Sequence, residues 1–237
     1  MAGIQNDSLR VLLTGATGMV GEGVLHACLT HEKVREVLVM TRRPTGEVHP
    51  KLKEIIVPDF FDLSALSEAL SGYDACLFCA GVTSIGKNEE TYTKLTYTLT
   101  LGLAETLIKL NPAMVFCYIS GAGTDSTEKG RVMWARVKGK TENDLLKLPF
   151  KGVYLFRPGF LIKDKAARHT LKAYRYVGWL VPVLKRVMPH RICTLDELGR
   201  AMIGVCLSGY EKPILEVPDM LQVVGAPRSR KSQTEIT

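Results

Sequence analysis

Three glycines at intervals of three, placed between an apolar strand and a helix, constrain the fold of this chain more than any other feature. Residues 11–13 read as a buried strand, and the sequence TGATGMVG at 14–21 leads into a helix predicted over 19–31. In this pattern the first glycine permits a sharp turn, the second admits an anion close to the backbone, and the third lets the helix pack closely on the strand. The helix N-terminus adds N–H groups and a partial positive charge. We therefore expect a pyrophosphate-binding turn that consists of Gly15, Thr17, Gly18, Met19, Val20 and Gly21.

Short apolar runs alternate with helix-length segments along most of the chain. The predicted strands occupy 9–14, 36–40, 54–57, 75–79, 114–119, 153–156 and 214–217. The other predicted helices occupy 63–71 (capped by Asp62), 88–110, 131–147 and 195–207 (capped by Thr194). Apolar strands separated by helices indicate a parallel sheet covered on both faces. The expected fold class is therefore α/β, a doubly wound parallel sheet of the Rossmann type.

The length of the chain fits one domain with a sizeable core, because 46% of its 237 residues are hydrophobic. We expect a single NAD(P)-binding domain over 1–223, in which 158–223 supply a small C-terminal substrate or lid region. The polar segment 224–237 is predicted to be a disordered tail. The sequence shows no apolar run long enough to span a membrane and no signal-peptide core at its start, so a cytoplasmic protein is expected.

The cysteines give no sign of a metal centre. Cys76 and Cys79 have Cys-x-x-Cys spacing, but they fall within a predicted strand, and neither a second such pair nor clustered histidines accompany them. Most of the other cysteines also lie in apolar runs. We expect buried thiols in a reducing compartment and no bound metal.

The residues after the second predicted strand favour NADP(H) over NAD(H). An acidic side chain at this place accepts a hydrogen bond from the ribose 2′-hydroxyl, whereas a basic one pairs with a 2′-phosphate. The chain reads Met40-Thr41-Arg42-Arg43-Pro44 here, with no Asp or Glu. Two guanidinium groups can hold a phosphate dianion bidentately. The alternative is that Arg42 and Arg43 are solvated loop charges.

Two further strand ends are predicted to contact the cofactor. After the third strand, Asp59 can accept a hydrogen bond from the adenine amino group, and Phe60 can form a wall beside the ring. In the competing interpretation, Asp59 is a turn residue and Asp62 only a helix cap, and both interpretations can hold together. After the fourth strand, the small residues Ala80 and Gly81 permit close approach to the cofactor ribose.

These motifs resemble the short-chain dehydrogenase/reductase superfamily in its atypical branch, with the nearest likeness to NmrA-like and Tat-interacting tumour-suppressor oxidoreductase-like proteins. The resemblance covers nearly the whole chain. It rests on TGATGMVG at 14–21, Asp59 and Asp62, CAG at 79–81, the Lys138 segment, RPGF at 157–160 and CTLDELGRAM at 193–202. It implies a Rossmann domain that holds NADP(H), with Pro158 beside the cofactor and the substrate cleft at the carboxyl ends of the strands.

The resemblance also implies a catalytic tyrosine four residues before a lysine. A phenol with a pKa near 10 needs a neighbouring cation to transfer protons near neutral pH. Lys138 matches the lysine, but Trp134 stands at the tyrosine position, and an indole cannot serve as the same proton donor. Ser120, Thr124 or Ser126 can supply the hydroxyl that the family places after the fifth strand. The predicted catalytic residues are Lys138, Ser120 and Thr124.

Three interpretations of Trp134 remain open at the sequence level. In the first, the chain binds NADP(H) as a sensor, scaffold or regulator without tyrosine-dependent catalysis. In the second, it is a reductase of an unidentified carbonyl or related small molecule, and its acid is Tyr174, Tyr176 or water. In the third, Trp134 is a core residue and the alignment with the family is shifted.

The net charge of +7 is concentrated in one segment. Residues 163–191 carry eight basic side chains and one acidic side chain, Asp164, interleaved with apolar residues that include Trp179. We expect this segment to cap the cleft, with solvated basic groups. The alternative is a surface for an anionic membrane or an acidic protein. Nucleic acid is not an expected partner, because no recognised binding module accompanies the charge.

Overall fold

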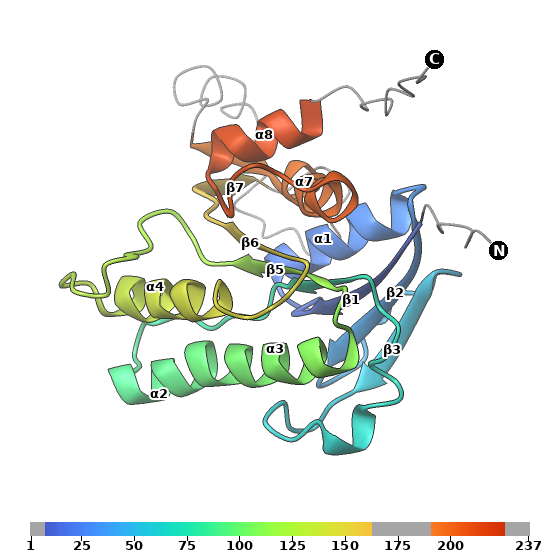
Figure 1. The fold of residues 1–237 in the computed structure, drawn as a ribbon, viewed down its shortest axis with the longest axis horizontal. Helices are drawn as coiled ribbons and strands as arrows, with labels where there is room; N and C mark the ends of the chain where they lie inside the picture. The colour runs from blue at the N-terminus through green and yellow to red at the C-terminus, as the bar shows by residue number, and fades with distance from the viewer. Residues whose placement is uncertain (1–7, 163–190, 226–237) are drawn as a thin grey trace, which may run out of the picture.

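The computed structural model describes residues 8–162 and 191–225, and a seven-stranded parallel sheet forms its centre (Figure 1). The strands are β1 (Leu9–Thr14), β2 (Val34–Thr41), β3 (Leu52–Ile56), β4 (Ala75–Phe78), β5 (Val115–Ile119), β6 (Gly152–Phe156) and β9 (Ile214–Leu215). Their order in the sheet is β3-β2-β1-β4-β5-β6-β9, and every neighbouring pair is parallel. The chain reverses its direction of winding between β1 and β4, which is the arrangement of the Rossmann fold. The predicted fold class is confirmed.

Helices cover both faces of this sheet (Figure 1). One face carries α1 (Met19–Thr30) and α7 (Leu195–Ser208), with α8 (Val217–Gly225) packed against α7. The opposite face carries α2 (Glu89–Thr93), α3 (Leu99–Leu110) and α4 (Met133–Leu145). Successive residues of β1 enter different cores: Val11 and Leu13 pack with α1, and Leu12 packs with α3. This double burial explains why the strands read as continuous apolar runs.

The predicted long helix 88–110 is present as one continuous helical segment with an irregular centre. Its first turn is capped by Asn88, whose side chain accepts a hydrogen bond from the Thr91 N–H at 2.9 Å. A π-helical turn, Lys94–Thr98, then joins α2 to α3. The π-turn lies against α4, the helix that carries Lys138.

The predicted helix 63–71 is wrong: this stretch contains only a 3₁₀ turn, Ser64–Leu66. Asp62 accepts hydrogen bonds from the backbone N–H and the hydroxyl of Ser64, at 3.1 and 2.7 Å, and so forms a local turn. Only Leu63 and Leu70 are buried here. With few apolar anchors, a short helix has little tertiary packing to stabilise it.

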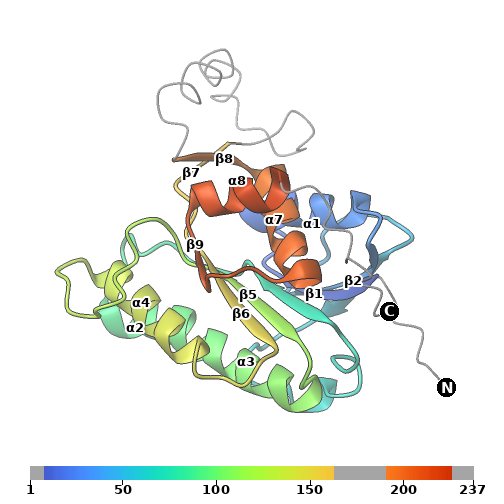
Figure 2. The same cartoon turned by 45° about the horizontal axis from the view of Figure 1, so that its top comes forward.

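The C-terminal part contains elements that the sequence pattern did not predict. A second, two-stranded parallel sheet pairs β7 (Phe160–Ile162) with β8 (Ile192–Thr194), and it lies beside α8 (Figure 2). The predicted cap of α7 is confirmed, because Thr194 and Glu197 form a reciprocal capping box. Helix α8 extends to Gly225, so the predicted tail 224–237 begins within a helix, and its remaining residues 226–237 lie outside the described ones.

Several predictions concern residues that the structure does not describe. Tyr174, Tyr176 and the basic segment, apart from Arg191, all fall within 163–190. Within the described ranges, the helices are too short or too polar to cross a bilayer.

The cysteines are buried as expected. All six lie within the described residues and none forms a disulfide. Cys79 is the most exposed, being half-buried just after the end of β4. Burial raises the pKa of the Cys28 and Cys76 thiols.

Candidate functional site

The glycine-rich turn between β1 and α1 is built by backbone contacts that exclude side chains. Gly15 has a φ of +74°, and a Cβ on it would lie 2.6 Å from the backbone of Cys79 and Ala80 at the end of β4. A Cβ on Gly21 would overlap the carbonyl oxygen of Gly15. Two of the three glycines are therefore required by the packing of the turn itself.

Gly18 differs from the other two, because a Cβ on it would make only an ordinary 3.4 Å contact with the Gly15 carbonyl oxygen. Gly18 is the N-cap of α1 and provides no side-chain hydrogen bond to the first turn. The amides of Met19 and Val20 have no acceptor within the helix at this position. The helix therefore presents backbone donors and the positive end of its dipole at the carboxyl edge of the sheet.

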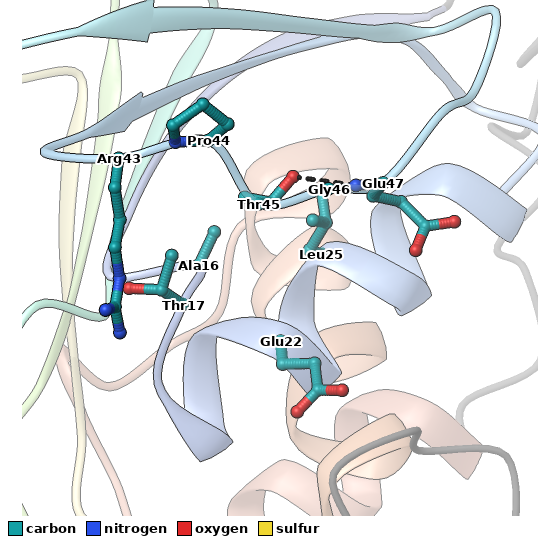
Figure 3. Close-up of a pocket in the computed structure, with 9 residues that line it drawn as sticks. All are labelled: Ala16, Thr17, Glu22, Leu25, Arg43, Pro44, Thr45, Gly46 and Glu47. Atoms are coloured by element: carbon teal, nitrogen blue, oxygen red, sulfur yellow. Dashed lines mark hydrogen bonds between the residues drawn. The ribbon is translucent and has the colours of Figure 1, made fainter.

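A cavity of about 330 Å³ opens beside this turn (Figure 3). Its walls come from the turn, from α1 and from the loop after β2, and they consist of Ala16, Thr17, Glu22, Leu25, Arg43, Pro44, Thr45, Gly46 and Glu47. Figure 3 shows the Arg43 side chain extending beside Thr17, whereas Glu22 and Glu47 lie away from it. The cavity thus has a basic side near the glycine turn and an acidic side further along α1.

The two arginines after β2 lie in a turn whose backbone is held by hydrogen bonds to Thr41. Arg42 and Arg43 are both exposed, and the hydroxyl of Thr41 donates to the Arg43 carbonyl oxygen at 2.7 Å. The same hydroxyl accepts from the Arg43 N–H at 3.4 Å. The backbone of this loop is therefore held by hydrogen bonds, while both arginines are exposed.

The other residues predicted to contact the cofactor also lie at the carboxyl edge. Asp59 accepts a hydrogen bond from the Phe61 N–H at 2.8 Å, so its role in the turn is present, and Phe60 is half-buried against the core. The Ala80 N–H donates to the Thr14 hydroxyl at 3.2 Å. A Cβ on Gly81 would meet no atom within 4 Å, so space is open beside this residue.

Lys138 lies on α4 and reaches the end of β5. Its Nζ donates to the carbonyl oxygen of Ser120, and the side chain is half-buried. Burial lowers the pKa of Lys138 to about 8, although the nearby carboxylate of Glu142 acts in the opposite direction and raises it. An amine with such a pKa exists in both protonation states near neutral pH.

Each of the three hydroxyls predicted after β5 already has a structural partner. The Ser120 hydroxyl donates to Oε1 of Glu142 at 2.5 Å, and the Thr124 hydroxyl donates to the Gly121 carbonyl oxygen at 2.8 Å. The Ser126 hydroxyl accepts from Nη2 of Arg157 at 2.5 Å. The structure brings Ser120 and Lys138 together, but it turns the Ser120 hydroxyl into the protein.

A buried ion pair between Glu142 and Arg157, which was not predicted from the sequence, lies beside this group. Glu142 is fully buried, and Arg157 donates to both of its carboxylate oxygens, with Nε 3.1 Å from Oε1. Arg157 follows β6, and the adjacent Pro158 is buried, with its carbonyl oxygen accepting from the Ala122 N–H at 2.9 Å. The spacing of four residues places Lys138 and Glu142 on one helix face, but no local pattern in the sequence pairs Glu142 with Arg157.

Trp134 occupies the first turn of α4, one turn before Lys138. It is half-buried, and its ring lies 3.6 Å from the position of a Cβ on Gly123. The indole therefore packs against the loop that follows β5. The expected relation between Trp134 and Lys138 on one helix is present, because residues four apart face the same side.

The strand order and the glycine turn together define a dinucleotide-binding protein of the Rossmann type. Residues 11–128 match the NAD dependent epimerase/dehydratase family. The chain belongs to this family, as an atypical short-chain dehydrogenase/reductase that binds a nicotinamide dinucleotide.

Curated relatives agree with this assignment. "Protein FMP52, mitochondrial" of Candida albicans is 26% identical over 230 residues, which cover 92% of this chain and 95% of the relative. "Protein HTATIP2" of Rattus norvegicus is 27% identical over 165 residues, which cover 68% of this chain and 66% of the relative. The expected likeness to the Tat-interacting branch is confirmed. The fungal relatives are named mitochondrial, so they lend no support to a cytoplasmic location.

Solved structures match the fold. Uronate dehydrogenase from Agrobacterium tumefaciens superposes with a TM-score of 0.63 at 16% identity, covering 88% of this chain and 76% of the other. A short-chain dehydrogenase/reductase superfamily protein from the same organism, with bound NAD, gives a TM-score of 0.61 at 13% identity over 90% and 80% of the two chains.

Proposed function

We propose that this protein binds NADP(H) and acts as an oxidoreductase on a small carbonyl compound. The observation that carries the proposal is the pairing of the glycine turn with Arg42 and Arg43 at the end of β2. Gly18 supports it, because the packing of the turn gives no reason for a glycine there, whereas a pyrophosphate approaching the first amides of α1 does.

The preference for a 2′-phosphate is supported by the charge of the loop after β2. Residues 41–46 contain two arginines and no carboxylate. A family member that prefers NAD(H) needs an acceptor for the 2′-hydroxyl at this place. The guanidinium of Arg43 borders the cavity beside Thr17, within the region that the adenosine end of the cofactor would occupy (Figure 3).

The proposed chemistry is supported by the residues at the carboxyl ends of β4 and β5. The winding of the sheet reverses between β1 and β4, and Lys138 lies on the β4 side of this point, at the end of β5. Ligands of open α/β sheets bind in the crevice at such a point. A bound NADPH would supply a hydride there. Lys138 would hold the nicotinamide ribose, and Ala80 and Gly81 leave room beside it.

A second candidate function is a cofactor-binding sensor or regulator without turnover. Trp134 favours it, because an indole occupies the helix position where the family places its tyrosine. The two functions share the cofactor site and differ only in whether NADPH is oxidised.

The cofactor preference is tested by calorimetric titration of NADPH and NADH into the wild type and the double variant Arg42→Ala/Arg43→Ala. We expect the double variant to lose about tenfold or more in NADPH affinity, because each charge-assisted hydrogen bond contributes about 1.5–3 kcal/mol. Its NADH affinity should not change. Arg35→Ala is the matched control, since Arg35 is an exposed residue near the opposite end of β2. Equal wild-type affinity for the two nucleotides would contradict the proposed preference.

A further inference from the structure

We propose that Lys138 itself donates the proton to the substrate oxygen, in place of the tyrosine that this chain lacks. The inference rests on the proposed function, because it requires NADPH at the same edge of the sheet. It assigns to the lysine a chemical step in addition to binding the ribose.

The position of the ammonium is the first argument. Lys138 extends from α4 to the end of β5, where its Nζ bonds the Ser120 carbonyl oxygen. An ammonium has three N–H donors, and this contact uses one of them. Since the group is half-buried at the carboxyl edge, its other donors can reach a ligand in the crevice.

The hydroxyls nearby are poor alternatives as acids. The proton of Ser120 is donated to Glu142, and that of Thr124 is donated to the Gly121 carbonyl oxygen. The Ser126 hydroxyl accepts a hydrogen bond from Arg157. Ser and Thr hydroxyls are also far weaker acids than an ammonium, so using them would require breaking a protein hydrogen bond and overcoming a larger pKa difference.

Trp134 removes the usual donor without closing the site to Lys138. Its indole N–H is a hydrogen-bond donor only, and it does not ionise in proton transfer. The ring packs toward Gly123, one helical turn from Lys138. Trp134 thus adds an apolar ring to the face of α4 that carries Lys138, and apolar surroundings favour the neutral amine that remains after proton donation.

The charges around Lys138 leave its amine able to lose a proton. Among the described residues, Glu142 is the acidic side chain that raises the pKa of Lys138. Its carboxylate already accepts hydrogen bonds from Arg157 and Ser120. Burial lowers the pKa of Lys138 to about 8, which is close to the working pH that suits a general acid. The elements packed against α4 carry other ionisable side chains, which are Glu89, Glu90 and Tyr92 on α2, Lys94 and Tyr97 on the π-turn, Glu105 and Lys109 on α3, Tyr118 on β5 and Asp125 in the loop after it. None of them contributes to the lowered pKa of Lys138.

The step balances without another reactant. When bound, NADPH supplies a hydride to the carbonyl carbon of the substrate. The electron pair of the carbonyl π bond moves onto the oxygen, where an O–H bond forms as one Nζ–H bond of Lys138 breaks. The amine is then neutral and regains its proton from water before the next turnover.

The first test measures the amine without cofactor or substrate. Acetic anhydride is applied in trace amount to the wild-type protein at a series of pH values, and mass spectrometry follows each lysine. We expect the reactivity of Lys138 to rise with a midpoint near its pKa of about 8. Lys140, an exposed residue on the same helix whose pKa is raised, is the internal control. A midpoint for Lys138 as high as that of Lys140 would overturn the proposal.

The second test measures turnover and binding separately. Phenanthrenequinone is the probe, because the loops after β4 and β5 expose the apolar side chains of Val82, Ile85 and Val132. We expect Lys138→Arg, which keeps the charge but cannot release a proton, to lower the rate of NADPH oxidation about 100-fold or more while calorimetry shows nearly unchanged NADPH affinity. Ethylamine should partly restore the rate of Lys138→Ala, and Lys140→Ala should behave as wild type.

The outcomes separate this inference from the proposed function. A wild type that fails to bind NADPH contradicts the proposed function, and this inference falls with it. A wild type that binds NADPH but does not reduce the quinone, or a Lys138→Arg variant that retains its rate, overturns only the role of Lys138 as proton donor. Loss of activity in Lys138→Ala without amine rescue assigns the lysine to ribose binding alone.

Discussion

Helix α1 packs so closely on its preceding turn that Gly21 has no room for a methyl group beside the carbonyl oxygen of Gly15. The contact fixes the direction in which the first amides of α1 point, and therefore the site for an anion. The local geometry of the turn and the proposed binding function depend on the same pair of glycines.

Gly21→Ala is expected to destabilise the fold by about 2 kcal/mol, because the added Cβ overlaps backbone atoms that cannot move independently. Urea denaturation measures this change. Gly102→Ala is the control, since Gly102 lies on α3 with no atom within 4 Å of its Cβ position, and alanine there should be neutral or stabilising. Equal free energies of unfolding for the two variants would refute the packing role of Gly21.

Gly18→Ala separates folding from binding. Its Cβ would meet only one atom, at an ordinary contact distance, so the free energy of unfolding should stay within about 1 kcal/mol of wild type. The affinity for NADPH should fall about tenfold, because the methyl group stands where the phosphates must approach the backbone. Calorimetry on the folded variant measures the affinity, and an unchanged dissociation constant would show that the phosphates bind elsewhere.

Glu142→Gln tests the buried pair with Arg157. Losing the carboxylate leaves a guanidinium that is 12% exposed without its counter-ion, and such changes cost about 3–5 kcal/mol. The attraction that raises the pKa of Lys138 is lost as well, so the acetylation midpoint of Lys138 should move to lower pH. Lys140→Ala breaks an exposed pair with Asp144 and should cost less than about 1 kcal/mol. An acetylation midpoint that stays in place would contradict the electrostatic link.

Glu36, near the amino end of β2, should make the free energy of unfolding sensitive to acid. Burial raises the pKa of this carboxyl, but hydrogen bonds from Lys53, Arg10 and Tyr73 outweigh that effect and hold the pKa at about 2. The ordinary glutamate pKa is higher, so the stabilisation is fully present above about pH 4.5 and is lost as the pH falls toward 2. Glu36→Gln should remove about 1–2 kcal/mol of this dependence after solvent screening.

Thermal unfolding between about pH 2 and pH 7 compares Glu36→Gln with Glu105→Gln, a change at an exposed position on α3. The Glu105 variant should follow the wild-type curve. If the Glu36 variant loses as much stability in acid as wild type does, the network around Arg10 is not the source of the acid sensitivity.

The local patterns predicted the parallel sheet well, for a physical reason. Strands such as β1 and β4 are buried on both faces, so each is a continuous apolar run that needs no partner to be recognised. The glycine turn was predictable because its spacing reflects contacts within a short segment. The start of α7 was predictable from Thr194 for the same reason, since its capping box involves residues only three apart.

The remaining features depend on contacts between distant residues. Whether 63–71 forms a helix was decided by its small buried surface, which the sequence does not show. The pairing of β7 with β8 joins segments about thirty residues apart, on either side of 163–190. Arg157 and Glu142 are 15 residues apart in the sequence, and only the folding of α4 against the end of β6 brings them together as a buried pair.

Titration of the wild-type protein with NADPH, followed by NADH under the same conditions, tests the central claim most directly. The account predicts a single site that binds NADPH at least about tenfold more tightly than NADH, because Arg42 and Arg43 add a contact to the 2′-phosphate. If neither NADPH nor NADH gives a heat of binding, the central claim is contradicted.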